Sequence, residues 1–253
     1  MDERIIFLSD THFTYHSIGD AERKKRARFL RFLESIDGVR SLFLVGDIFD
    51  FWFEYRSAVP PFYHDILEGL HTLKSGGTSI LITGGNHDHW LGRHLSDDLG
   101  FTILPPLSTH TLQGRTITVT HGDTLLPGDF GYKALKACIR SRPVIALARL
   151  VHPDLLYALA RRFSRASKTI THKKTARSAR ILAGRAEDSF FRWGNDIFVM
   201  GHIHYPQLIR FGRKVFVMLG DWVEHFSYMV LESGETTLER YSDDGENTLI
   251  EKR

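Results

Sequence analysis

The residues best suited to chemistry in this chain occur in five short polar blocks. The blocks are Asp10-Thr11-His12, Gly46-Asp47, Gly85-Asn86-His87-Asp88, His121-Gly122-Asp123 and Gly201-His202-Ile203-His204. Carboxylate, amide and imidazole groups without cysteine suit divalent metals that prefer oxygen and nitrogen ligands. Two such metals about 3.5–4 Å apart are a recurrent device for hydrolysing phosphate esters. The five blocks therefore predict a two-metal phosphoesterase site.

Each block follows a short apolar run that predicts a β-strand. The runs are residues 5–8, 42–45, 80–83, 117–120 and 197–200. Helical patterns at 20–35, 62–74 and 90–99 follow the first three runs, an order typical of βαβ units in a parallel sheet. Ligands in such sheets lie at the carboxyl ends of the strands. Further along the chain, turns between alternating runs predict antiparallel hairpins at Gly114, Gly212 and Gly234.

Residues 130–192 interrupt the later β pattern with helices. Val144 and Leu147 recur at helical spacing, and Pro153 is a typical helix start. We expect one domain, residues 1–253, with this segment as a helical insertion between the fourth and fifth blocks. The order of strands and helices predicts a mixed α/β (α+β) fold class.

Composition indicates a globular protein with an unevenly charged surface. The chain has 253 residues, 42% of them hydrophobic, and a single cysteine, Cys138, which cannot form an internal disulfide. The N-terminus lacks the basic-then-apolar order of a signal peptide, and no apolar run reaches the ~18 residues of a spanning helix. The net charge is +3, yet residues 133–192 carry 15 Lys and Arg against three Asp and Glu. We therefore expect a cytoplasmic protein with one strongly basic segment.

The basic insertion has three interpretations. Arg161 and Arg162 lie beside Leu155, Leu159 and Phe163, so the helix can cover an amphiphile or lie on an anionic membrane. It can equally be an ordinary amphipathic helix packed on the core, with its arginines in water. Nucleic-acid binding is less favoured, because the segment's aromatic residues gather at its far end instead of being interleaved for stacking.

Taken in order, the five blocks resemble the calcineurin-like metallophosphoesterase superfamily over nearly the whole chain. The resemblance implies a two-sheet sandwich flanked by helices, with the helical insertion as a lid. The resemblance implies one metal site made by Asp10, His12, Asp47 and His204. It implies a second site made by Asp47, Asn86, His121 and His202, with Asp47 bridging the two. It also implies a catalytic pair, with His87 near the leaving-group oxygen and Asp88 orienting it. The expected cofactors are two divalent ions, with Mn²⁺ preferred and Fe²⁺ or Zn²⁺ as alternatives.

Further motifs resemble a narrower family, the UDP-2,3-diacylglucosamine diphosphatases of lipid A biosynthesis. The motifs are His121-Gly122-Asp123-Thr124-Leu125, Asp129, Gly131-Tyr132, Ser167-Lys168 and Leu219-Gly220-Asp221-Trp222. The resemblance implies hydrolysis of the substrate diphosphate by a metal-bound hydroxide, giving UMP and 2,3-diacylglucosamine 1-phosphate. The implied substrate contacts are Asn86, His87, Asp129, Ser167, Thr171, Lys174 and His202. This chain departs from the best-known members of that family at two positions. Those members have Arg where this chain has His87, and Asn where this chain has Thr171.

These resemblances define the expected partners and the alternatives. We expect the substrate to be a nucleotide-linked glycolipid. We also expect the basic lid to contact the inner membrane surface, which would make the protein a peripheral cytoplasmic enzyme. The enzyme is expected to be a monomer and to bind no nucleic acid. One alternative is a general phosphodiesterase, nucleotide pyrophosphatase or nuclease of the same superfamily. Another is a non-catalytic interaction module that uses the fold without metal, which the complete ligand set disfavours.

Overall fold

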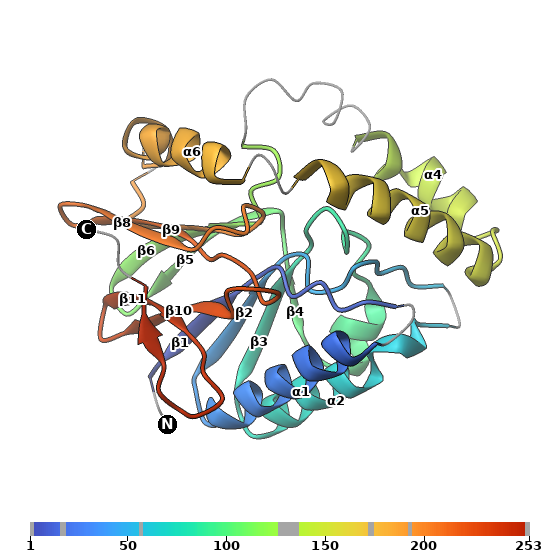
Figure 1. Ribbon diagram of the computed structural model, residues 1–253, viewed down its shortest axis with the longest axis horizontal. Coiled ribbons are helices and arrows are strands. Elements are labelled where there is room, and N and C mark those ends of the chain that lie inside the picture. Colours follow the sequence, from blue (N-terminus) through green and yellow to red (C-terminus); the bar gives the residue numbers. More distant parts are fainter. Residues whose placement is uncertain are drawn as a thin grey trace.

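Two β-sheets packed face to face form the centre of the molecule (Figure 1). The computed structural model describes residues 3–15, 19–55, 58–125, 137–171, 175–191 and 194–250, with the backbone alone described for 163–171 and 175. The seven-stranded sheet has the order β12-β11-β10-β1-β2-β3-β4, and the five-stranded sheet has the order β5-β6-β7-β9-β8.

The strands of the larger sheet are β1 (Ile5–Leu8), β2 (Ser41–Val45), β3 (Ser79–Thr83), β4 (Thr102–Leu104), β10 (Ser227–Glu232), β11 (Glu235–Arg240) and β12 (Thr248–Leu249). Those of the smaller sheet are β5 (Leu107–Leu112), β6 (Arg115–Thr120), β7 (Ile197–Met200), β8 (Gln207–Phe211) and β9 (Lys214–Met218). Strands β1 to β4 run parallel, as do β6, β7 and β9. The strands that precede the five blocks therefore end on the same side of their sheets.

Side-chain alternation along β1 explains why the fold has layers. Ile5 and Phe7 are buried between the two sheets, whereas Ile6 and Leu8 are buried on the opposite face. That outer face is covered by α1 (Asp20–Ser35) and α2 (His64–Ser75), and the outer face of the smaller sheet packs on α6 (Thr175–Phe190). Figure 1 shows these helices on opposite sides of the sandwich. The predicted two-sheet sandwich flanked by helices is confirmed.

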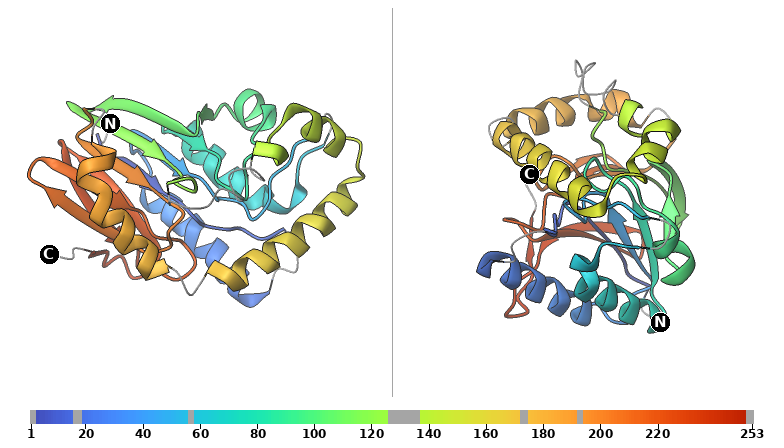
Figure 2. Two further views of the ribbon diagram at one scale, coloured as in Figure 1. Left: turned by 90° about the horizontal axis from the view of Figure 1, so that it is seen from above. Right: turned by 90° about the vertical axis from the view of Figure 1, so that its right-hand side faces the viewer.

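The region predicted as an insertion contains α4 (Arg142–Ala148), α5 (Pro153–Thr171) and α6. Figure 2 shows α4 and α5 at one end of the sandwich, away from α6. They are anchored there by hydroxyl groups, because Tyr55 donates to the carbonyl of Val151 (2.9 Å) and Tyr15 donates to that of Tyr157 (3.3 Å). The boundaries of the domain and of the insertion, 1–253 and 130–192, stay predictions.

The sequence correctly predicts the strands that precede the blocks, the first helix and the three hairpins. The prediction of a helix over the whole of 90–99 is wrong. Only a short π-helix (His94–Asp98) forms there. The carboxylate of Glu54 accepts hydrogen bonds from the backbone N–H groups of Gly92 (2.9 Å) and His94 (3.0 Å). The earlier residues are thereby held as a loop. The helix predicted at 62–74 is confirmed as α2, preceded by a 3₁₀ turn (Pro61–Tyr63).

Candidate metal centre

The side chains predicted to hold metal meet at the carboxyl ends of five strands. In the order β1, β2, β3, β6 and β7, these strands are followed by Asp10 and His12, Asp47, Asn86, His121, and His202 and His204. Strands from both sheets contribute, so the centre lies where the two layers of the sandwich end together. All seven residues lie within the described part of the chain.

The backbone at this edge is locally strained. Four of the residues have positive φ angles: 56° at Asp10, 45° at His12, 52° at Asp47 and 69° at His202. A left-handed conformation costs a non-glycine residue about 1–3 kcal/mol and is retained mainly at functional sites. The sharp turns bring each side chain back over the end of its strand.

Two glycines allow the strand ends to approach closely. A Cβ atom on Gly85 would lie 2.1 Å from Oδ1 of Asp47, and one on Gly46 would lie 2.5 Å from Nδ1 of His121. Either side chain would displace a predicted ligand. Packing at the centre thus requires glycine at both positions, and at Gly46 the left-handed φ of 81° favours it as well.

The first half of the centre, which we call site A, consists of Asp10, His12 and His204 together with Asp47. The ligand atoms of the first three lie within 4.8 Å of one another. Nε2 of His204 is 3.2 Å from Oδ1 of Asp10 and 3.2 Å from Nε2 of His12. Oδ2 of Asp47 is 3.8 Å from Nε2 of His12. The four groups are therefore directed at one small volume.

The second half, site B, consists of Asp47, Asn86, His121 and His202. The ligand atoms of Asp47, His121 and His202 lie within 4.8 Å of one another. Nε2 of His121 is 3.4 Å from Oδ2 of Asp47 and 3.2 Å from Oδ1 of Asn86. The same carboxylate oxygen of Asp47 thus faces both sites, as a bridging ligand must.

Outer hydrogen bonds orient the two buried imidazoles. Nδ1 of His12 donates to Oδ1 of Asp50 (3.1 Å), and Nδ1 of His121 donates to the carbonyl of Val45 (3.0 Å). Each bond leaves Nε2 directed into the centre. Metal-binding histidines are typically held in this way, by a carboxylate or carbonyl on the other ring nitrogen.

The contacts of His87 and Asp88 correct one expectation. The carboxylate of Asp88 accepts hydrogen bonds from the N–H groups of Gly85, Asp47, Ile48 and Phe49, at 2.7 to 3.2 Å. It holds the backbone of the loop after β2 and does not bond to the His87 ring in the described structure. Nδ1 of His87 donates instead to the carbonyl of Asp50 (3.2 Å). Asp88 is therefore a backbone anchor, because its oxygens are occupied by main-chain donors.

Electrostatics make the centre complementary to cations. Burial opposes protonation of the imidazoles of His12 and His121. Polar contacts with the carboxylates of Asp10 and Asp50 nevertheless raise the pKa of His12 to about 10, and the charge of Asp47 raises that of His121 to about 10. The pKa of Asp47 is held well below its ordinary value despite burial, chiefly by the charge of His121. Burial and the charge of His121 lower the pKa of His202 to about 4. In the metal-free protein, two imidazolium groups balance the charge that metal ions would neutralise.

The donor set fits two divalent cations. Oδ1 of Asp10 is fully buried and accepts no hydrogen bond in the described structure, although Nε2 of His204 lies 3.2 Å away. An acceptor left unmatched in this way is costly unless a cation takes its lone pair. Carboxylate, amide and imidazole ligands suit Mn²⁺, Fe²⁺ and Zn²⁺, and the geometry favours none of them over the others.

Metal binding is expected to release protons. Since the pKa values of His12 and His121 are about 10 in the metal-free protein, both are protonated at pH 7.5 and must lose a proton to bind metal. We expect release of about two protons on loading and an apparent affinity that falls roughly tenfold per proton for each unit that the pH is lowered. Calorimetry in buffers of different ionisation enthalpy measures this number. Release of less than about half a proton would contradict the assigned charges.

The predicted substrate contacts beyond the centre fall largely outside the described residues. This applies to Asp129 and Lys174, and to the side chains of Ser167 and Thr171 on α5. Their role stays a prediction.

Sequence patterns assigned no role to two residues that border the centre. Asp50 supports both His12 and His87, and its position three residues after Asp47 was the available signal. Arg140 donates to the carbonyl of Gly85 (2.9 Å) and lies 3.9 Å from Oδ2 of Asp123. Nothing in the sequence distinguishes Arg140 from the other basic residues of its segment.

A cavity of about 920 Å³ lies between α4 and the loops that follow β2 and β3. Its lining is mixed, with Phe53, Trp90 and Ile145 on the apolar side and Arg149 among the charged residues. Trp90 follows Asp88 by two residues, so part of the cavity lining comes from the segment directly after the third polar block. The volume is within the range of small-molecule sites, about 300–1,000 Å³.

The outer surface of α4 and α5 carries exposed leucines among basic residues. Leu147 is 63% exposed, Leu150 83%, Leu155 56% and Leu159 42%. Arg149, Arg161 and Arg162 are exposed on the same helices and their connection. No single described helix is long and apolar enough to span a membrane, and the pair that together reaches that length, α4 with residues 153–162, is bent by 118°.

Comparisons with known proteins agree with this geometry. The family model described as calcineurin-like phosphoesterase matches residues 3–206, a range that contains all five blocks. A UDP-2,3-diacylglucosamine hydrolase of Pseudomonas putida is 28% identical over 226 residues, covering 86% of this chain and 90% of that protein. A protein of the same name from Xanthomonas oryzae pv. oryzae is 27% identical over 251 residues, covering 94% and 98%.

A likeness among solved structures concerns the fold alone. Vacuolar Protein Sorting 29 of Cryptosporidium parvum superposes with a TM-score of 0.51 at 15% identity, covering 98% of this chain and 95% of that one.

Proposed function

Because this chain belongs to the calcineurin-like phosphoesterase family and is a phosphoesterase, we propose that it hydrolyses the diphosphate of UDP-2,3-diacylglucosamine. The products are UMP and 2,3-diacylglucosamine 1-phosphate, as in lipid A biosynthesis. Relatives named for this substrate align over most of the chain. The observation that carries the proposal is the two-site centre, in a chain that also has a cavity lined partly by apolar side chains and a helical pair with exposed leucines and arginines.

The side chains of the centre have distinct tasks in this reaction. Site A and site B would each hold one divalent cation, and Asp47 would contact both. When bound, the two cations supply an activated water and neutralise charge on the phosphoryl oxygens. Asp50 keeps His12 and His87 in place, and Asp88 keeps the loop that carries Asp47 in its turned conformation.

We propose that His87 moves a proton at the reacting phosphate. With Nδ1–H donated to the Asp50 carbonyl, its Nε2 has a lone pair directed elsewhere. Burial lowers the pKa of His87, so the ring is neutral near pH 7 and can accept a proton. In the hydrolysis, the water oxygen would bond to phosphorus, the bridging P–O bond would break, and Nε2 of His87 would accept the proton that the water loses. The departing phosphate ester has a second pKa of about 6, so it leaves without a strong acid.

A product assay tests the substrate. Purified protein with Mn²⁺ and UDP-2,3-diacylglucosamine is expected to produce UMP in step with the lipid phosphate. Cleavage of a simple aryl phosphodiester without UMP production would eliminate the lipid substrate and leave a general phosphodiesterase. Equal rates on free nucleotide diphosphates, independent of acyl chains and detergent, would favour the nucleotide pyrophosphatase alternative.

We further propose that the leucine-rich surface of α4 and α5 rests on an anionic membrane. Burial of a leucine contributes about 1.5–3 kcal/mol. The pair Leu147→Asp and Leu150→Asp is therefore expected to weaken binding to phosphatidylglycerol-containing vesicles at least about tenfold in flotation assays. The control is Leu249→Asp, since Leu249 is 62% exposed on β12. The proposal would be contradicted if Leu249→Asp weakened vesicle binding as much as the double variant does, or if the double variant bound vesicles as the wild type does.

The remaining expectations complete the proposed setting. The enzyme would act as a monomer at the cytoplasmic face of the inner membrane, with Mn²⁺ as the preferred metal, and would bind no nucleic acid. Metal analysis of the purified protein tests whether Mn²⁺ is the preferred ion. Analytical sedimentation tests whether the enzyme is a monomer.

A further inference from the structure

Lys25, on α1, contacts the backbone of the loop that carries two ligands of site A. Its Nζ donates to the carbonyl oxygens of Thr11 (2.8 Å) and His12 (2.7 Å) and lies 2.9 Å from the carboxylate of Glu22. The side chain is 11% exposed. An ammonium group has three protons to donate, which matches these three acceptors.

The two carbonyls belong to a backbone that needs support. Asp10 and His12, on either side of Thr11, both have left-handed φ angles. The hydroxyl of Thr11 donates to the carbonyl of Ile48 (2.6 Å), which ties the loop to the segment after Asp47. Lys25 binds the same loop from the helix side, and a cation between two neighbouring carbonyls offsets their mutual repulsion.

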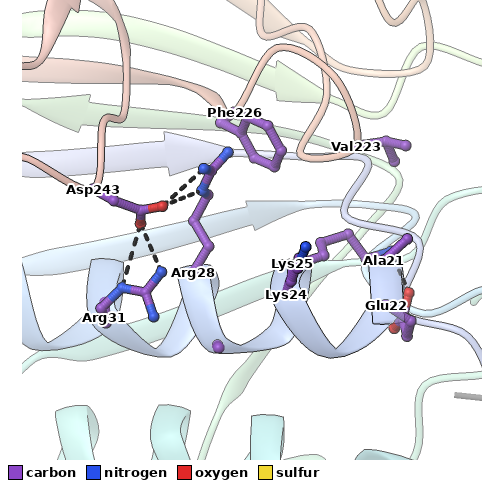
Figure 3. Close-up of a pocket in the computed structure, with 10 residues that line it drawn as sticks. Ala21, Glu22, Lys24, Lys25, Arg28, Arg31, Val223, Phe226 and Asp243 are labelled. Atoms are coloured by element: carbon purple, nitrogen blue, oxygen red, sulfur yellow. Dashed lines mark hydrogen bonds and ion pairs between the residues drawn. The ribbon is translucent and has the colours of Figure 1, made fainter. Parts of the chain in front are cut away.

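Arg26, the next residue of α1, shares the carboxylate of Glu22 with Lys25, at 3.0 Å, but contacts other carbonyls. Arg26 donates to the carbonyls of Thr14 and Phe62, and Arg28 and Arg31 both pair with Asp243. Figure 3 shows the latter pair directed at Asp243 beside a groove of about 480 Å³, with Lys24 and Lys25 further along the same helix. Lys24 is exposed and adjacent in sequence, so it is a matched control for Lys25.

We propose that Lys25 is a positioning residue that preorganises site A by holding the carbonyls of Thr11 and His12. The proposal rests on the two-metal centre of the proposed function. The carbonyls that Lys25 holds, those of Thr11 and His12, belong to the loop after β1, whereas Asn86, His121 and His202 of site B follow β3, β6 and β7. Loss of the ammonium group therefore lowers the affinity of site A for its ion and leaves the ion at site B in place.

The test is the Mn²⁺ content of Lys25→Met, Lys25→Arg and Lys24→Met, measured by mass spectrometry after equilibrium dialysis across a range of Mn²⁺ concentrations. Replacement of a group that supports metal ligands typically lowers affinity 10–100-fold. We expect Lys25→Met to hold one ion with wild-type affinity and to need at least about tenfold more Mn²⁺ for the other. Lys24→Met should hold both ions as the wild type does. Lys25→Arg, which retains charge and donors, should be intermediate.

A spectroscopic readout separates positioning from general support. The electron paramagnetic resonance signal of two coupled Mn²⁺ ions should give way to that of a single ion in Lys25→Met at limiting metal. Wild-type affinity for both ions, or equal weakening of both with a lower melting temperature, would overturn the proposal. If Lys25→Met does not fold, selective loss of one ion in Lys25→Arg is the deciding result. A wild-type protein that binds fewer than two ions would overturn the proposed function instead, and this proposal with it.

Discussion

Asp47→Ala is expected to abolish phosphoesterase activity and to lower bound metal below one ion per chain. One carboxylate oxygen of Asp47 lies 3.4 Å from Nε2 of His121 and 3.8 Å from Nε2 of His12, so both sites lose a ligand at once. The substitution also leaves two buried imidazoles without the charge that balances them. Loss of a single electrostatic contact in an active site costs about 10²–10³ in turnover, and loss of both ions should cost more.

Two controls separate this effect from unfolding. Asp47→Asn keeps the volume of the side chain but not its charge, and we expect it to fold and to lose activity to a similar extent. Asp97→Ala, an exposed carboxylate of the short π-helix, should retain activity and both ions. The measurements are turnover of an aryl phosphodiester, metal content and circular dichroism. Retention of two ions by either Asp47 variant would mean that Asp47 is not the bridge.

His87→Ala is expected to lower turnover about 10²-fold and to leave both metal ions bound. Positioned acid–base groups typically contribute 10²–10⁴-fold. His87 belongs to neither site A nor site B, although its ring lies near ligand atoms of His12 and Asp47. The loss should therefore be in kcat, with little change in metal content.

His89→Ala is the matched control for this prediction. His89 is two residues further along the same loop and lines the cavity beside α4. We expect its replacement to change KM for a lipid substrate more than kcat. His87→Arg should retain part of the activity on UDP-2,3-diacylglucosamine, since guanidinium binds phosphate oxygens well. If His87→Ala and Asp47→Ala lose metal equally, the roles assigned to the two residues are wrong.

Strand periodicity located the proposed ligands well. The runs at 5–8 and 197–200 coincide with β1 and β7, and the residues directly after them lie together at site A. Short apolar runs followed by Asp or His are a local signal, and parallel pairing brings the carboxyl ends of strands to one edge. The order of the blocks, together with the family that it resembles, therefore predicted which residues meet.

Local patterns failed where long-range hydrogen bonds compete with them. The apolar spacing at 90–99 suggests a helix, but Glu54, about 40 residues earlier, takes the N–H groups of Gly92 and His94. Asp88 follows His87 directly, yet its carboxylate bonds to main-chain donors of the loop after β2. Neither partner can be read from neighbouring residues.

The sequence by itself predicted the strand ends and the polar blocks that follow them, because these depend on short-range periodicity and on residue chemistry. Its resemblance to a known family supplied the two-sheet sandwich and the seven side chains proposed to hold metal. Only the tertiary structure decided how they are supported. Lys25 reaches the carbonyls of Thr11 and His12, and Arg140 reaches that of Gly85, through contacts between separate elements. Because the acceptors in these contacts are backbone carbonyls, which every residue has, no pattern of side chains in the sequence predicts them. Their geometry exists only once the chain is folded.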